Sequence, residues 1–127
     1  MNINDVKVIL IQNLGMKVED IENGIITYWK IKEDIVKEIV FFHDTETKLL
    51  YISLRFEKLK QEKSLISLLR YNLSLSLVKF CLDEQKRVIA LVEMPDHILS
   101  EDLIKRSLYS LSKAAERYYE IKFMKSN

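Results

Sequence analysis

The chain has 127 residues, which suits one domain with one continuous core, and we expect a single domain over residues 1–127. Its composition, 48% hydrophobic and 31% charged residues, excludes the profile of a disordered chain and that of a membrane protein. The 20 basic and 19 acidic residues are interleaved and leave a net charge of +1, so we expect no binding of nucleic acid.

The first predicted element is a helix that begins at a cap formed by Asn4 or Asp5 and ends at Gly15. The apolar spacing then changes to short runs of β-branched and aromatic residues, which are typical of strands. The three predicted strands cover residues 25–31, 35–43 and 49–56. Because the turns between them are short and polar, we expect these strands to be antiparallel neighbours.

Apolar residues occupy both faces of the second predicted strand. Ile39 and Phe41 point to one face, whereas Val40 and Phe42 point to the other. The third strand instead alternates apolar and polar residues, as in a sheet that is covered on one face. The second strand is therefore predicted to be central, or to have an outer face that is also covered.

The second half of the chain predicts two helices around a hairpin. Leucines at helical spacing predict a helix over residues 62–73, and two strands follow at residues 75–82 and 87–94, the latter again apolar on both faces. Ser100 caps a long amphipathic last helix. The predicted order is α-β-β-β-α-β-β-α, so the fold class is α+β, with a mostly antiparallel sheet and helices packed on it.

Residue types that carry chemistry are sparse in this sequence. Only two glycines occur, and neither lies in a strand-to-helix loop that could hold a phosphate. His43 and His97 are the only histidines, and no ligand spacing accompanies them. Cys81 is the only cysteine and lies in a predicted strand, where such residues are usually inert. We therefore expect no catalytic residue, metal or cofactor, and an enzyme that uses Cys81 or His43 is the least favoured hypothesis.

The cell compartment is predicted from the cysteine count and the N-terminus. A lone cysteine excludes a disulfide within one chain, which fits a reducing compartment. Residues 1–5 lack a basic region followed by a long apolar run, and no segment is long and apolar enough to span a bilayer. We expect a cytoplasmic protein that does not bind membranes.

Aromatic residues are the side chains most suited to contacts with a partner. Tyr118 is in phase with the apolar face of the last helix and is predicted to be structural. Tyr109 and Tyr119 lie off that face and are better candidates for contacts. Trp29, in the first strand, is a further candidate.

The segment from residue 65 to residue 121 resembles the YbjN family, whose fold is that of the type III secretion chaperones. The resemblance is carried by four short motifs: Leu68-Leu69-Arg70-Tyr71-Asn72-Leu73, Lys79-Phe80-Cys81-Leu82-Asp83, the strand from Val88 to Glu93, and Ala114-Ala115-Glu116-Arg117-Tyr118-Tyr119. It implies a non-enzymatic binding domain, commonly a homodimer, whose open sheet and helix surface receives an extended segment of a partner. It brings no catalytic motif to this chain.

Two hypotheses for function follow. The first is a protein-binding domain, chaperone-like or a regulatory adaptor, that acts as a homodimer and binds a partner protein or an extended peptide of unknown identity. The candidate partner-binding residues are Trp29, Phe42, Tyr51, Ile89, Leu91, Tyr109 and Tyr119. The alternative is a small-molecule sensor with an apolar pocket between the sheet and the last helix, lined by residues such as Trp29 and Phe42.

Overall fold

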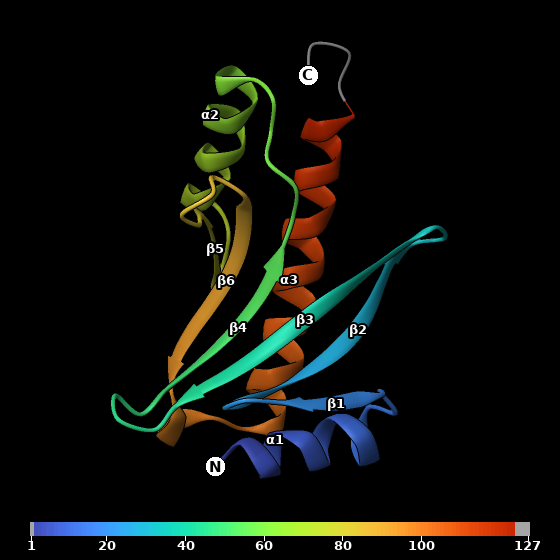
Figure 1. The fold of residues 1–127 in the computed structure, drawn as a ribbon, viewed down its shortest axis with the longest axis vertical. Helices are drawn as coiled ribbons and strands as arrows, with labels where there is room; N and C mark the ends of the chain where they lie inside the picture. The colour runs from blue at the N-terminus through green and yellow to red at the C-terminus, as the bar shows by residue number, and fades with distance from the viewer. Residues whose placement is uncertain (1, 124–127) are drawn as a thin grey trace.

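The computed structural model describes residues 2–123 and consists of one six-stranded sheet with helices packed against it (Figure 1). The strands are β1 (Val18–Ile21), β2 (Gly24–Lys32), β3 (Ile35–Asp44), β4 (Leu49–Arg55), β5 (Val78–Leu82) and β6 (Val88–Pro95). The helices are α1 (Ile3–Val8), α2 (Glu62–Arg70) and α3 (Glu101–Lys122). Their order along the chain confirms the α+β class.

All neighbouring strands in the sheet are antiparallel. The order across the sheet is β1-β2-β3-β4-β6-β5, so β3 and β4 lie in the middle and β1 and β5 form the edges. The expectation of a central second strand is therefore confirmed for β3. Hairpins account for four of the five pairings, β1–β2, β2–β3, β3–β4 and β5–β6, and the fifth brings β4 beside β6.

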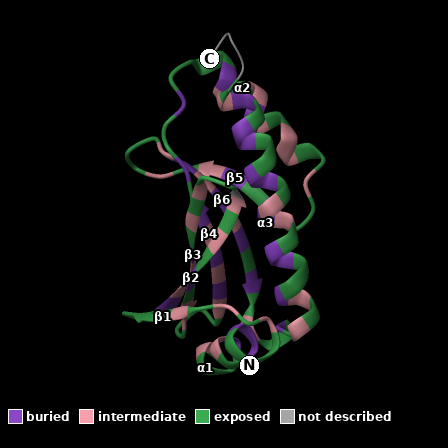
Figure 2. Cartoon of the chain, turned by 90° about the vertical axis from the view of Figure 1, so that its right-hand side faces the viewer, coloured by how far each residue is buried: buried purple, intermediate pink, exposed green. Residues whose placement is uncertain are grey.

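The core lies between one face of the sheet and α3. Both views place α3 along that face, with α1 at one end of the sheet (Figures 1 and 2). The sheet contributes alternate residues to this core, among them Ile39 and Phe41 of β3 and Ile52 and Leu54 of β4, and α3 contributes Leu111. The period of two predicted for these strands is confirmed by this burial.

The first helix begins two residues earlier than predicted. Asn2 is its cap: the Asn2 side chain accepts a hydrogen bond from the backbone N–H of Asp5, and the Asp5 carboxylate accepts one from the backbone N–H of Asn2. This reciprocal pair is a capping box, so the prediction of Asn4 or Asp5 as the cap was wrong. The helix continues through a π-helical turn, Ile9–Asn13, and Gly15 follows with φ of +65°, as predicted for its end.

Two other boundaries differ from the prediction. The second helix ends at Arg70 and is followed by a 3-10 turn, Tyr71–Leu73, so β5 begins only at Val78. The short strand β1 was not predicted. The last helix is capped by Ser100 as expected, because the Ser100 side chain accepts a hydrogen bond from the backbone N–H of Leu103.

Candidate protein-binding surface

One face of the sheet is not covered by any helix of the described residues, and we call it the open face. It is formed by the alternate strand positions that point away from α3. The side chains that carry the argument below are Val40 and Phe42 of β3, Tyr51, Ser53 and Arg55 of β4, and Arg87, Ile89 and Leu91 around β6. Five of these eight side chains are apolar or aromatic, and the charged residues Glu38, Lys79 and Glu93 also lie on this face, so the sheet keeps some hydrophobic surface on both faces.

Four of the predicted partner-binding residues lie together on the open face. Phe42 pairs with Tyr51 across β3 and β4, and their ring centroids are 6.2 Å apart. Leu91 and Ile89 follow on β6, where Leu91 pairs with Ser53 of β4. Phe42 is 38% exposed, and the other three are partly buried by their neighbours. These residues form the apolar strip of the open face, and polar residues border it, since Tyr51 pairs with Glu93 and Ile89 pairs with Arg55.

Trp29 lies on the opposite face of the sheet from this strip. It pairs with Lys37 and is two residues from the buried Thr27, so its side chain points to the helix side and packs against the core. Trp29 and Phe42 are therefore separated by the sheet itself. The expected sensor pocket lined by both residues is wrong, because strand alternation places them on different faces.

Tyr109 and Tyr119, both on α3, have opposite environments. Tyr109 is 63% exposed and lies beside the segment of residues 74–78 that leads into β5. Tyr119 is only 4% exposed, so the expectation that it lies off the core face is wrong. Its ring packs edge-on against Phe56 and Tyr118, with centroid distances of 5.8 Å and 5.0 Å. The buried stripe of α3 is wider than the predicted one because Phe56, directly after β4, and aromatic residues of α3 itself pack together at its C-terminal end.

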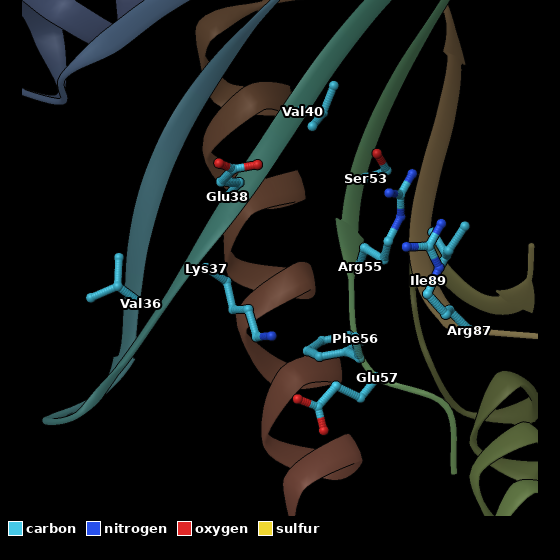
Figure 3. Close-up of a pocket in the computed structure, with 10 residues that line it drawn as sticks. All are labelled: Val36, Lys37, Glu38, Val40, Ser53, Arg55, Phe56, Glu57, Arg87 and Ile89. Atoms are coloured by element: carbon cyan, nitrogen blue, oxygen red, sulfur yellow. The ribbon is translucent and has the colours of Figure 1, made fainter. Parts of the chain in front are cut away.

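A hollow of about 430 Å³ opens where β3 and β4 diverge (Figure 3). One wall is β3, with Val36, Glu38 and Val40; the other is formed by β4 and the start of β6, with Arg55 and Ile89. Arg87 also lies on this second wall. The hollow continues the apolar strip of the open face and adds charged groups to it.

The two arginines of the hollow share one carboxylate. Arg87 Nε donates to Asp83 Oδ2 at 2.8 Å, whereas Arg55 Nε lies 4.0 Å from the same oxygen. Partial burial raises the pKa of Asp83, but hydrogen bonds from Arg87 and from the backbone of Gln85 outweigh it and hold that pKa below its ordinary value. Asp83 therefore stays ionised and neutralises one guanidinium group, which leaves one positive charge in excess.

Cys81 and His43, the residues considered for catalysis, lie in surroundings that suit a structural role. Burial and the nearby Asp83 carboxylate raise the pKa of the Cys81 thiol, which opposes formation of the reactive thiolate. His43 Nε2 lies 3.0 Å from Asp96 Oδ2, in a pair that joins the end of β3 to the turn after β6. Between residues 2 and 123 the structure holds no group of three or more histidine, cysteine or acidic side chains able to bind a metal.

No helix among the described residues has both the length and the apolar character needed to cross a membrane.

Arg55, Arg87 and Asp83 were not predicted as a group. Arg55 belongs to the third predicted strand and Arg87 begins the fifth, so their proximity depends on the pairing of β4 with β6. Alternation shows which face a residue occupies but not which strand lies beside it. The only available sign was that Arg55 shares a face with Tyr51, a residue that was singled out.

No protein-family model matches this chain, and no curated protein matches it. Several solved structures match this chain. A chain of the HopA1–SchA chaperone–effector complex matches with a TM-score of 0.65 and 18% identity, over 90% of this chain and 93% of that chain. The Yersinia pestis type III secretion chaperone SycH, in complex with a stable fragment of YscM2, gives a TM-score of 0.61 and 23% identity, over 84% and 92% of the two chains.

YbjN from E. coli is also similar, with a TM-score of 0.57 and 13% identity over 87% of this chain and 86% of its own. At these identities the likeness is one of fold. The chain therefore has the fold of the type III secretion chaperones and of YbjN, which confirms the fold expected from the sequence resemblance.

Proposed function

We propose that this chain is a chaperone-like or regulatory adaptor that binds an extended segment of another protein on its open face, and that it acts in the cytoplasm as a homodimer without catalysing a reaction. The observation that carries the proposal is the apolar strip of Phe42, Tyr51, Ile89 and Leu91 on a sheet face that no described helix covers. An antiparallel sheet that faces only water is normally polar on that side. Exposed apolar residues with a polar border are instead typical of a protein–protein contact.

The fold supports the same function. SchA and SycH are chaperones whose structures were solved as complexes with other proteins, and the sheet and helices of this chain match them over most of its length. A shared fold does not fix a function, so the apolar strip and not the likeness is the main support.

Binding is tested with an unfolded polypeptide, such as reduced and carboxymethylated lactalbumin, by fluorescence anisotropy. The variant with Phe42→Thr and Leu91→Thr keeps strand-forming residues but removes most of the apolar area of the strip. We expect its affinity to fall at least about tenfold, since each large side chain contributes about 1.5 kcal/mol or more when it is fully buried in a contact. Tyr109→Ala removes an exposed aromatic residue of α3 outside the strip and tests Tyr109 as a separate contact.

The homodimer is tested by light scattering over a concentration series. We expect the mass of two chains. A monomer at high concentration that also binds neither the unfolded polypeptide nor an apolar dye would refute the proposed function. A monomer that does bind the polypeptide would refute only the homodimer.

A further inference from the structure

The pairing of β3 with β4 stops halfway along β3. Its last pair is Ile39 with Leu54. Beyond this point β4 stays paired with β6. Arg55 pairs with Ile89, and the backbone N–H of Phe56 donates to the carbonyl oxygen of Val88 at 2.8 Å. The remaining part of β3, Ile35–Glu38, pairs with β2 only. Figure 1 shows this divergence, and it leaves an edge of β3 toward the hollow that no described strand occupies.

The outer edges of the sheet are less suited to accept another strand. On β5, the side-chain amide of Asn72 bonds both backbone groups of Phe80: its nitrogen donates to the carbonyl oxygen at 3.0 Å, and its oxygen accepts from the N–H at 2.7 Å. On β1 the edge is four residues long and carries two acidic side chains, Glu19 and Asp20. Short, charged or covered edges are the usual protection against pairing with other chains.

The inner edge of β3 is also four residues long and carries the charged side chains of Lys37 and Glu38, but unlike β5 it has no described side chain bonded to its backbone groups. Val36, at its centre, is an apolar side chain that is 59% exposed. Apolar residues also continue from this edge into the hollow, through Val40 on β3 and Ile89 on β6. An extended peptide beside Ile35–Glu38 can form backbone hydrogen bonds and at the same time bury side chains on the open face.

The charges of the hollow specify the side chain that such a peptide should carry. Arg55 and Arg87 lie on the wall opposite β3, whereas Lys37 and Glu38, which carry opposite charges, lie on the β3 wall (Figure 3). Asp83 accepts a hydrogen bond from Arg87, and Glu57, which also lines the hollow, accepts one from Lys122 at 2.5 Å and lies near Lys37. The surplus positive charge is therefore on the side of Arg55, which is 60% exposed. A carboxylate that points away from β3 fits this arrangement.

We propose that the gap between β3 and β4 is a strand-addition site for an extended segment of a partner protein that carries an acidic side chain between apolar residues. The backbone of this segment pairs with β3 along Ile35–Glu38. Its carboxylate contacts Arg55 and Arg87, and its apolar side chains lie on Val40 and Ile89. This site rests on the proposed function and adds to it the chemistry of the segment that is bound.

The test compares two labelled peptides about eight residues long, the length of an ordinary strand. Both alternate valine and threonine, and the central residue is glutamate in one and lysine in the other. We expect the glutamate peptide to bind at least about tenfold more tightly, because it forms charge-assisted hydrogen bonds in place of a like-charge contact. We also expect Arg55→Glu to reverse this preference. Arg106→Glu makes the same charge change on the exposed side of α3 and should leave it unaltered.

Hydrogen exchange locates the peptide. Within residues 35–38, the alternate backbone amides that point away from β2 should exchange more slowly with the glutamate peptide bound, since strand addition gives them hydrogen-bonded partners. Binding without this protection, equal affinity for both peptides, or an unchanged preference in Arg55→Glu would overturn the site. So would binding of unfolded lactalbumin with no binding of either peptide, which would leave the proposed function standing. Failure of all three probes to bind would overturn both.

Discussion

Gly24 begins β2 at a point where the backbone of β3 leaves no room for a side chain. A Cβ atom there would overlap the carbonyl oxygen of Phe41. We predict that Gly24→Ala lowers the free energy of unfolding by about 2 kcal/mol or more, since backbone must shift to relieve the overlap. Urea unfolding measures this loss.

Gly15 provides the matched control for that substitution. It has φ of +65° but open space around it, so Gly15→Ala should cost only the strain of the left-handed conformation, about 1 kcal/mol. A loss in Gly24→Ala no larger than this would contradict the close approach of β2 and β3.

Asp96 makes stability depend on pH in the acid range. The hydrogen bond from His43 is the main cause that holds the pKa of Asp96 below its ordinary value, and partial burial opposes it. A carboxylate with a depressed pKa in the folded state stabilises the fold above its unfolded pKa, and that contribution is lost as pH falls through the folded pKa. We therefore predict that Asp96→Asn destabilises the protein at about pH 5, and that its difference from the unmodified protein shrinks toward about pH 3 or below.

Urea unfolding at a series of pH values measures this difference. A difference that stays constant over the range would show that the ionised carboxylate does not contribute through its contact with His43.

At the scale of single elements, Asn72 protects the edge of β5. Replacing it with alanine leaves the N–H and carbonyl oxygen of Phe80 without their side-chain partners. We predict that Asn72→Ala lowers the free energy of unfolding by about 1 to 2 kcal/mol, since two hydrogen bonds are lost and a typical one contributes about 0.5 to 1.5 kcal/mol. We also predict stronger self-association through the exposed edge.

Light scattering and urea unfolding check both parts. Ser74→Ala is the control, because the Ser74 hydroxyl donates only to the carbonyl oxygen of Tyr71 within its own turn. If Asn72→Ala and Ser74→Ala behave alike, the edge of β5 is not protected by Asn72.

The one strand that was not predicted shows where element-level reasoning fails. β1 has the sequence Val18-Glu19-Asp20-Ile21, which lacks the apolar alternation of a half-buried strand. Its place is set by the turn to β2, where Asn23 has φ of +61° directly before Gly24. An Asn-Gly pair is a strong turn signal, so this hairpin could have been predicted from the turn and not from the strand.

At the scale of the whole molecule, the two faces of the sheet should differ in their contribution to folding. Leu111 is fully buried between α3 and the sheet, and Leu111→Ala should cost about 2 to 5 kcal/mol. Val40 lies on the open face, and we predict that Val40→Thr changes stability by no more than about 0.5 kcal/mol, as for other substitutions outside the core. Guanidinium unfolding of both variants measures the contrast. A large loss in Val40→Thr would mean that the open face is needed for folding.

Local patterns sufficed to predict the class and most of the fold. Alternation along β4 predicted which residues are buried, and short polar turns predicted three of the hairpin neighbours. The pairing of β4 with β6 joins segments far apart in the sequence, and no local pattern encodes it. The apolar strip was predicted because it follows from alternation within strands. The hollow with Arg55 and Arg87 was not predicted. It forms only where β4 stays paired with β6 and separates from β3.

The alternation along β3 also bears on how such a chain can change during evolution. Selection for a stable fold acts on Ile39 and Phe41, which are buried against the helices, whereas selection for a partner acts on Val40 and Phe42 on the other face. Adjacent codons are then under separate pressures, and a new partner can be acquired without rebuilding the core. Among related sequences, the substitution rate along β3 should therefore rise and fall with a period of two residues.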